Sequence, residues 1–206
     1  MNFNDKEYWH KYYKKNYSPY KESDFAKFVL QFLEKEKYLL ELGCGNGRDS
    51  IFFSKNLINV LAVDQVSDEI NFLNSNFSNE RIKFICDDFT NLEVLDNFDY
   101  IYSRFTIHSI TESEEDRVLK WVFKHLYKNG LFFIESRSIN DIMYNNGTKL
   151  SINENFTDHY RRYMNKDKFI SKLEYIGFKI RYSIEDKGLA VSEKEDPSIV
   201  RIIAEK

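Results

Sequence analysis

The chain alternates between short, uniformly apolar runs and amphipathic stretches from about residue 23 to its end. Phe25, Phe28 and Val29 recur at helical spacing behind Ser23, a good N-cap, whereas the run YLLEL at 38–42 is typical of a buried strand. Strands are predicted over 38–42, 58–64, 81–88, 98–105, 131–137, 178–187 and 198–206, and helices over 5–16, 24–37, 48–56, 67–77, 111–130 and 165–178.

Strands that alternate with helices form a parallel sheet with helices on both faces. We therefore expect an α/β fold, a Rossmann-like doubly wound seven-stranded sheet in one domain over 1–206. The last two strands suit an antiparallel pair, so the sheet should be mostly parallel with an antiparallel C-terminal strand. We expect residues 1–36 to form an N-terminal helical cover. The polar, irregular segment 138–164 is interpreted as an insertion on the substrate side, because long irregular segments are often functional.

Two of the predicted helices carry signals at their ends. Thr111 and the glutamates after it suit the start of the helix over 111–130, and Gly130 suits its end. Asn165 is the expected N-cap of the helix over 165–178. These positions can be checked directly against hydrogen bonds.

Composition narrows the class of protein. The chain has 206 residues, 42% of them hydrophobic, and a formal charge of −3, which suits a folded domain without the bulk charge of a nucleic-acid binder. Its two cysteines, Cys44 and Cys86, are expected to be reduced, as in a cytoplasmic protein. No signal core or membrane span is evident, and no histidines have metal-ligand spacing, so we expect no metal. The protein is expected to be a monomer or homodimer.

A cluster of three glycines follows the first predicted strand, in the stretch LLELGCGNGRDS at 39–50. Glycines between a strand and a helix let the backbone approach a nucleotide closely. Dinucleotide-binding turns use the spacing GxGxxG, but here the third such position is Arg48. Glu41 at the strand end would repel a pyrophosphate and attract a positively charged ligand.

At this point the sequence resembles the class I S-adenosylmethionine-dependent methyltransferases, of the small-molecule type similar to methyltransferase domains 11 and 25. ELGCGNG matches their first motif, an acid followed by GxGxG, and VLAVDQ matches their second strand. FICDDF, FDYIYSRFTIHSI and YKNGLFFIES match the third, fourth and fifth strands. The resemblance covers roughly residues 25–206 and implies S-adenosylmethionine as cofactor and S-adenosylhomocysteine as product.

The resemblance also implies roles for particular residues. Asp64 would accept the ribose hydroxyls, Asp88 would meet the adenine amino group, and Phe89 would lie against the adenine. Asp49 stands where some members of the family approach the methionine moiety, although it could be an ordinary first-turn residue. The expected cofactor-binding residues are Glu41, Gly43, Cys44, Gly45, Gly47, Asp64, Gln65, Asp88, Phe89 and Ser103.

Two histidines are candidate catalytic bases. His108 follows the fourth strand at the sheet edge where ligands bind, and His159 lies in the insertion. A hydroxyl acceptor would need a base, whereas an amine or thiolate would need little more than positioning. The alternative for His108 is a histidine packed beneath the cofactor.

The stretch DHYRRYM at 158–164 is the candidate acceptor site. Together with arginines at two strand ends, it suggests binding of a phosphate or carboxylate. The alternative is that Arg161 or Arg162 pairs with Glu135, Asp158 or Glu185. The N-terminal aromatic residues are interpreted as a lid. The expected substrate-binding residues are Tyr8, Trp9, Tyr13, Tyr20, Arg104, Arg137, Arg161 and Arg162.

The acceptor is narrowed by what the fourth-strand motif lacks. It reads SRFT rather than the Asn-Pro-Pro-Tyr type used on amide and exocyclic amino groups, which favours a small molecule over nucleic acid. By analogy, we expect a phosphorylated or sugar-linked metabolite. The alternatives are a detoxifying methyltransferase of the tellurite or thiol type, a non-catalytic cofactor-binding protein, and a dinucleotide oxidoreductase.

Overall fold

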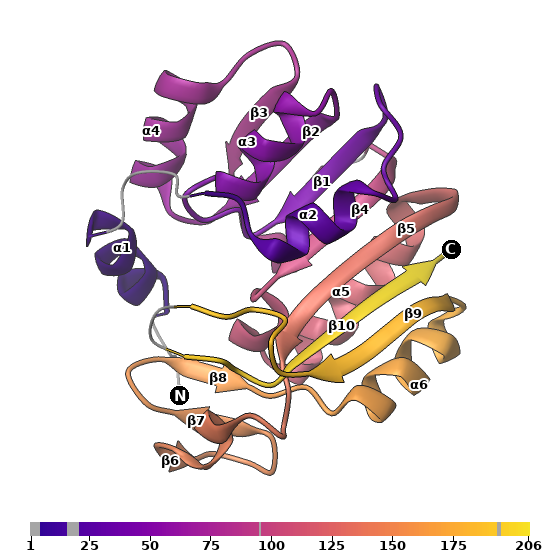
Figure 1. Ribbon diagram of the computed structural model, residues 1–206. Coiled ribbons are helices and arrows are strands. Elements are labelled where there is room, and N and C mark those ends of the chain that lie inside the picture. The colour runs from indigo at the N-terminus through magenta and orange to yellow at the C-terminus, as the bar shows by residue number, and fades with distance from the viewer. Residues whose placement is uncertain (1–4, 16–20, 95, 193–194) are drawn as a thin grey trace.

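The fold is built around one twisted sheet of seven strands in the order β3-β2-β1-β4-β5-β10-β9 (Figure 1). This computed structural model describes residues 5–15, 21–94, 96–192 and 195–206. The C-terminal strand β10 is antiparallel to both of its neighbours, and the other pairs between adjacent strands are parallel, which confirms the predicted sheet. The strands are β1 (Tyr38–Leu42), β2 (Asn59–Asp64), β3 (Ile82–Cys86), β4 (Phe98–Arg104), β5 (Leu126–Arg137), β9 (Lys179–Asp186) and β10 (Ile199–Glu205).

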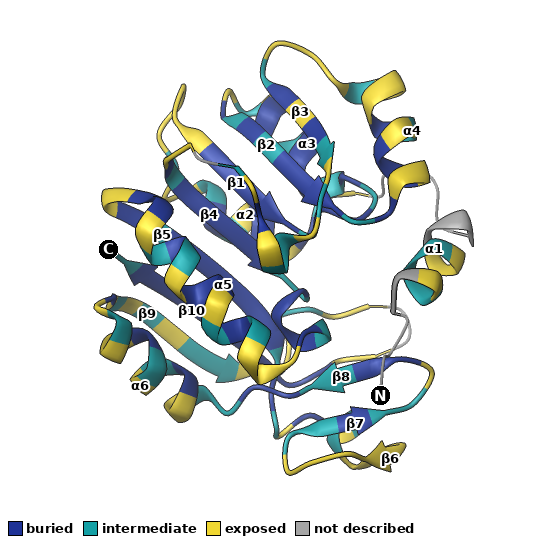
Figure 2. Cartoon of the chain, turned by 180° about the vertical axis from the view of Figure 1, so that it is seen from behind, coloured by how far each residue is buried: buried dark blue, intermediate teal, exposed yellow. Residues whose placement is uncertain are grey.

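Helices cover both faces of the sheet, so the central strands are buried on both sides (Figure 2). One face packs against α2 (Asp24–Leu30), α3 (Arg48–Lys55) and α4 (Ser67–Phe77), and the other against α5 (Glu112–His125) and α6 (Lys166–Ile176). The two cores alternate along the strands: on β1, Leu39 faces α2 and α3 while Leu40 and Leu42 face α5. This double burial explains why the strands read as apolar runs.

The N-caps lie where the sequence predicts them. Ser23 Oγ accepts from Ala26 N at 3.0 Å, and Asn165 Oδ1 accepts from Lys168 N at 3.0 Å. Thr111 forms a capping box with Glu114, whose carboxylate accepts from Thr111 N at 2.7 Å. These reciprocal bonds satisfy backbone groups that the first helical turn leaves unpaired.

Two predicted helix ends are wrong. The helix after Thr111 ends at His125 rather than Gly130, because residues 126–130 run extended beside β4, with Leu126 paired to Phe98. A side chain at Gly130 would lie 2.9 Å from two backbone oxygens, so the close approach of this extended segment requires a glycine. The helix over 24–37 likewise ends at Leu30 and continues into turns.

The segment 138–164, expected to be irregular, contains a 3-10 turn η3 (Ile142–Asn145) and a small antiparallel sheet. Arg162 anchors this sheet: its Nε donates to Ile110 O at 3.2 Å and its Nη2 pairs with the buried Glu115 of α5. Lys172 Nζ on α6 lies 2.8 Å from the same carboxylate. The strands are β6 (Thr148–Lys149), β7 (Glu154–Phe156) and β8 (Tyr160–Arg162).

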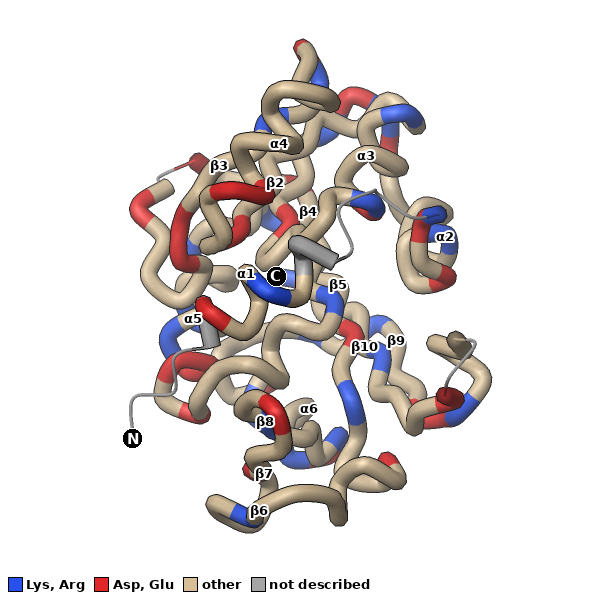
Figure 3. The backbone as a smooth tube through the Cα atoms, turned by 90° about the vertical axis from the view of Figure 1, so that its left-hand side faces the viewer, with Lys and Arg blue, Asp and Glu red and all other residues tan. Residues whose placement is uncertain are grey.

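The first helix, α1 (Asp5–Lys15), lies beyond the carboxyl ends of the parallel strands, on the same side as β6–β8 (Figure 1). It contacts two distant parts of the chain. His10 Nδ1 lies 3.6 Å from Asp68 Oδ2 on α4, and Tyr8 OH donates to Asp158 Oδ2 at 3.3 Å. Viewed from that side, basic and acidic residues are interspersed (Figure 3). None of the helices within the described residues has the length and apolar character that crossing a membrane requires.

Candidate cofactor and acceptor site

The glycine turn between β1 and α3 adopts a backbone that other residues disfavour. Gly43, Gly45 and Gly47 have φ angles of 71°, 55° and 72°, all in the left-handed region. A Cβ atom on Gly43 would lie 2.3 Å from Thr106 Cγ2, and one on Gly47 would lie 2.8 Å from Leu73 Cδ2. The glycines therefore form the turn that the sequence pattern predicts, and Gly43 and Gly47 also allow close packing against Thr106 and Leu73.

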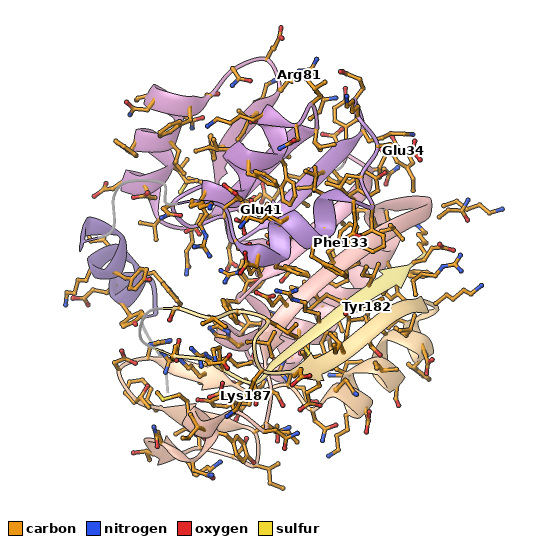
Figure 4. All side chains as sticks on the ribbon, viewed as in Figure 1. Glu34, Glu41, Arg81, Phe133, Tyr182 and Lys187 are labelled. Carbon is orange, nitrogen blue, oxygen red and sulfur yellow. The ribbon has the colours of Figure 1, made fainter. Side chains whose placement is uncertain are left out.

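Two buried carboxyl groups stand at the carboxyl ends of neighbouring strands. Asp64 accepts from Gly45 N at 2.9 Å and from Val66 N at 3.0 Å, which holds the turn beside it. Glu41 accepts from Ser50 Oγ, and Figure 4 shows it in the interior of the fold. Burial raises the pKa of both carboxyl groups, and the charge of Asp49 raises that of Glu41 further. A positively charged ligand placed here would restore ionisation.

A further buried acid, Glu69, lies near enough to Asp64 for the charge of Asp64 to affect it. Glu69 on α4 is 2% exposed, and its Oε1 has no hydrogen-bond partner among the described residues. Burial and then the charge of Asp64 raise the pKa of Glu69 to about 7. The group therefore titrates near neutral pH in the folded chain but near pH 4.5 when unfolded.

Glu69 is expected to make stability pH-dependent. Because its folded pKa is raised, the stability that its proton provides is lost as pH rises through about 7. From pH 6 to 8 the loss should be about 1 kcal/mol, or about 2–4 °C in Tm. Thermal unfolding of wild type and Glu69→Gln at both pH values tests this. The variant should show the smaller decrease, and equal decreases would contradict the assignment.

Asp49 is tied into the structure more firmly than a first-turn surface residue would be. Its carboxylate accepts from Ser23 N and Ser23 Oγ, both at 2.7 Å, and from Tyr102 OH at 2.8 Å. These bonds join the starts of α2 and α3 to β4. The sequence does not predict this network, because its three residues are far apart along the chain. Asp49 also lines the cavity described below.

The end of β3 brings the predicted adenine residues to the same edge. Asp88 Oδ1 accepts from Thr90 N at 2.8 Å and caps the short turn η1 (Phe89–Asn91). Asp88 and Phe89 line the cavity with Glu41, Gly43, Cys44, Gly45, Asp64 and Gln65. Two predicted cofactor residues lie apart from its lining: Gly47 packs on Leu73, and Ser103 is fully buried and hydrogen-bonded to Thr106.

A single cavity of about 1290 Å³ joins the glycine turn to α1 and β8. Its floor is the edge of the sheet, where β1, β2, β3 and β4 end. Its walls come from the segment after Pro19, from η2 (Ile107–Ser109) and from the loop before β10. Typical small-molecule pockets measure about 300–1,000 Å³, so this cavity has room for two small ligands side by side.

Both candidate histidines line this cavity, at the end away from β2 and β3. His108 is 6% exposed, and its Nδ1 has no hydrogen-bond partner among the described residues. Burial, then the positive charges of Arg161 and Arg137, hold its pKa well below the usual value. Burial and Arg161 also lower the pKa of His159 to about 4. Both rings are neutral at neutral pH.

The four predicted arginines occupy different environments. Arg104 Nε lies 2.9 Å from Glu135, and Arg137 pairs with Asp141 at 3.1 Å and with Glu195. Both still line the cavity, as does Arg161. The prediction that Arg162 contributes to this site is wrong. Its guanidinium is held by Glu115 and Ile110, and it does not line the cavity.

Aromatic residues of α1 cover part of the cavity. The ring of Tyr8 stacks on that of His159 at 4.1 Å between centroids, and Trp9 meets His159 edge-on at 5.4 Å. Tyr8, Trp9 and Tyr12 all line the cavity. Tyr20 and the side chain of Tyr13 lie outside the described residues.

Phe105 also lines the cavity, and no sequence pattern predicted that role. It directly follows β4, and its φ of 54° is unusual for a bulky side chain. The guanidinium carbon of Arg104 lies 4.4 Å from the ring centroid and that of Arg137 lies 5.9 Å away. Strained backbone of this kind is concentrated at ligand sites. No group of three or more His, Cys, Asp or Glu side chains in the described ranges could hold a metal ion.

Both the sequence and the fold of this chain are similar to those of known methyltransferases. Residues 39–130 match the family model described as a methyltransferase domain. No curated protein matches the sequence. Among similar solved structures, a methyltransferase from Methanosarcina mazei described as S-adenosylmethionine-dependent is 18% identical, covers 87% of this chain and 96% of its own, and has a TM-score of 0.72. The 1,6-didemethyltoxoflavin-N1-methyltransferase of Burkholderia thailandensis is 19% identical, covers 88% of this chain and 76% of its own, and has a TM-score of 0.69. The glycopeptide N-methyltransferase MtfA is 14% identical, covers 91% of each chain, and has a TM-score of 0.70.

The family match and the structural similarity concern different features of the chain. The match begins at Leu39 on β1 and ends at Gly130 within β5, so it contains the glycine turn, Asp64 and Asp88. The structural similarity covers 87–91% of the chain and shows the fold. Residues 39–130 therefore match a methyltransferase domain, and the chain has the fold of the S-adenosylmethionine-dependent methyltransferases to which it is similar.

Proposed function

We propose that the protein transfers a methyl group from S-adenosylmethionine to a small anionic acceptor, such as a phosphorylated or sugar-linked metabolite. The observation that carries the proposal is the single cavity that runs from the glycine turn to the histidines and arginines. One end presents the carboxyl groups of Glu41 and Asp64, which suit a cationic nucleoside. The other end presents Arg161, which suits an anion. A cofactor and an acceptor could meet in this space.

The residues at the first end fit the cofactor by their chemistry. When bound, S-adenosylmethionine supplies a sulfonium methyl group. Asp64 retains lone pairs beyond those used by Gly45 and Val66, and these would accept the ribose hydroxyls. Asp88 and Phe89 would bind the adenine, and the negative charge of Glu41 would attract the amino group.

The protein's own contribution to transfer is positioning and exclusion of water. The buried strand ends fix the cofactor side, while α1 and β8 cover the acceptor side, which favours an in-line approach. For a hydroxyl acceptor, the neutral ring of His108 would accept the proton, because its Nδ1 has no other partner among the described residues. Amine and thiolate acceptors would need no such base.

One similar structure supports a small acceptor. The Burkholderia enzyme is described with 1,6-didemethyltoxoflavin and S-adenosylhomocysteine both bound, so a protein of this fold can hold an acceptor together with the cofactor product. MtfA is described as a glycopeptide N-methyltransferase, so larger acceptors also occur on the fold. The choice of a small acceptor here rests on the cover formed by α1.

Calorimetry and a transfer assay test the proposal. S-adenosylhomocysteine should bind saturably to the full chain, and NAD should not compete with it. Methyl-labelled S-adenosylmethionine should then label phosphorylated or carboxylated metabolites in a panel, and not their uncharged counterparts. Preferential binding of NAD would overturn the cofactor assignment. Binding without transfer to any acceptor would indicate a cofactor-binding protein instead.

The same assay separates the proposal from methylation of an uncharged thiol. Such an acceptor offers no oxyanion to the arginine, so Arg161→Gln would leave its methylation unchanged, whereas tellurite is an oxyanion and is tested by its own place in the acceptor panel. We expect the variant to raise KM for the labelled anionic acceptor at least tenfold, because a charge-assisted hydrogen bond contributes about 1.5–3 kcal/mol. Arg181→Gln is the matched control, because Arg181 pairs with Glu205 outside the cavity.

A further inference from the structure

Two buried imidazole nitrogens, on residues that line the acceptor end of the cavity, have no partners among the described residues. His108 Nδ1 and His159 Nε2 have no hydrogen-bond partner among the described residues, although the two side chains are only 6% and 2% exposed. Buried polar groups are ordinarily paired, because leaving one unpaired costs about 1–3 kcal/mol. Both residues line the same cavity, so a ligand there could supply the missing partners.

Arg161 is the positive residue that acts most strongly on both rings. Its side chain comes from β8, which the bond from Arg162 to Ile110 holds against the end of η2. Among the described residues, the carboxylate oxygen nearest to Arg161 is on Asp158, 3.9 Å from Nη2, and Thr157 Oγ1 accepts from Nη1 at a long 3.4 Å. By contrast, Arg104 and Arg137 have carboxylates at 2.9 and 3.1 Å.

We propose that Arg161, His108 and His159 form an anion subsite that binds a carboxylate or phosphate of the acceptor and takes up a proton as it does so. The inference deepens, and rests on, the proposed methyl transfer to an anionic acceptor. The fork of N–H groups on Arg161 can meet two anion oxygens, and each imidazole adds one donor once its nitrogen carries a proton. A protonated His108 cannot also act as a base, so this subsite suits amine and thiolate acceptors, which need none. Four N–H donors from three side chains around one anion resemble a phosphate site more than a surface ion pair.

The rings are held in place before any ligand arrives. His159 stacks on Tyr8 of α1 at 4.1 Å, and His108 packs against Phe105 at 5.7 Å between ring centroids. Phe105 is itself fixed by its left-handed backbone and by Arg104 above its ring. A rigid subsite loses little freedom on binding, which favours affinity for a small anion.

Proton uptake follows from the charges that face each ring. His108 faces Arg161, Arg137, Arg104 and the ring of His159. His159 faces Arg161 and Arg137, with Asp158 2.8 Å from its Nδ1 and the hydroxyl-bearing ring of Tyr8 above. Burial and the arginines keep the pKa of both rings low, and an anion placed among them would offset the arginine charge. The proton would come from solvent and remain on an imidazole nitrogen.

Imidazole NMR on the full chain, loaded with S-adenosylhomocysteine, tests the subsite with inorganic phosphate as the probe. The chain has four histidines, so His10 and His125, which do not line the cavity, serve as internal references. Phosphate should shift the signals of His108 and His159 saturably toward the imidazolium form, and His159→Gln assigns the two signals. Arg161→Gln should weaken phosphate binding at least tenfold, whereas Arg181→Gln should leave it unchanged.

Each alternative outcome has a distinct meaning. A parallel titration with acetate decides whether the site prefers carboxylate or phosphate, and calorimetry in two buffers of different ionisation enthalpy should show uptake of a proton. If the loaded protein shows no saturable shift with either anion, or if Arg161→Gln binds as wild type does, the subsite is refuted while the methyltransferase assignment stands. If S-adenosylhomocysteine itself fails to bind, the proposed function fails first.

Discussion

Asp64→Ala is expected to weaken S-adenosylhomocysteine binding by about 100-fold in calorimetry. The substitution removes the carboxylate proposed to accept both ribose hydroxyls, and two charge-assisted hydrogen bonds at about 1.5 kcal/mol each amount to about 3 kcal/mol. It also frees Gly45 N and Val66 N, which Asp64 now holds at 2.9 and 3.0 Å. The glycine turn would lose the side chain that fixes its position, which acts in the same direction.

Asp99→Ala is the matched control for Asp64→Ala. Asp99 also accepts a backbone N–H, from Tyr38 at 3.0 Å, and it lies at the start of β4 rather than near the cavity. Its loss should lower Tm slightly and leave the Kd for S-adenosylhomocysteine unchanged. An unchanged Kd in a folded Asp64→Ala variant would show that Asp64 does not contact the cofactor. Thermal unfolding of both variants establishes that they are folded.

The cofactor end could be predicted from sequence because its determinants are local. Each predicted acid there lies at or just after the end of a strand, and parallel strands bring their carboxyl ends to one edge. The left-handed backbone at the three glycines can be predicted from their residue type alone. Gly47 and Ser103 belong to the motifs but do not line the cavity, because Gly47 packs on Leu73 and Ser103 bonds Thr106. A motif predicts where a residue lies in the chain, but it does not predict which groups its atoms contact.

The acceptor end could be predicted only in outline, because its charges are paired by the tertiary structure. Glu135 lies opposite Arg201 in the register of β5 and β10, and the same carboxylate lies 2.9 Å from Arg104. Only the strand order reveals that arrangement. Arg161 and Arg162 are adjacent in sequence, yet successive strand residues face opposite ways, so one reaches the cavity and the other reaches Glu115.

The misjudged segments share a physical cause. The strands of the insertion are short and polar, and Asn155, Tyr163 and Arg162 hold them through bonds to distant backbone. The end of α5 likewise depends on pairing with β4, which overrides the helical pattern of the residues after His125. Periodicity reports which face of an element is buried, so it is weakest where hydrogen bonds to other segments decide the conformation.

The same glycine turn gives the prediction with the largest expected effect on stability, Gly43→Ala. The new Cβ would meet Thr106 Cγ2 at 2.3 Å, and the φ of 71° is unfavourable for alanine. A left-handed alanine costs about 1–2 kcal/mol and overpacking about 1–3 kcal/mol, so we expect a loss of about 3 kcal/mol. Thermal unfolding should show a Tm lower by about 6–12 °C, with weakened S-adenosylhomocysteine binding.

Two further variants separate the backbone effect from the steric one. Gly188 has nearly the same φ, 74°, and nothing lies within 4 Å of its added Cβ, so Gly188→Ala should cost only the backbone contribution of about 1–2 kcal/mol. In Gly43→Ala/Thr106→Ser the clashing methyl group is gone while the hydroxyl that bonds Ser103 stays, so the double variant should recover most of the difference. Equal Tm values for the two single variants would show that Thr106 moves aside, and the turn would then be less tightly packed against β4 than its geometry indicates.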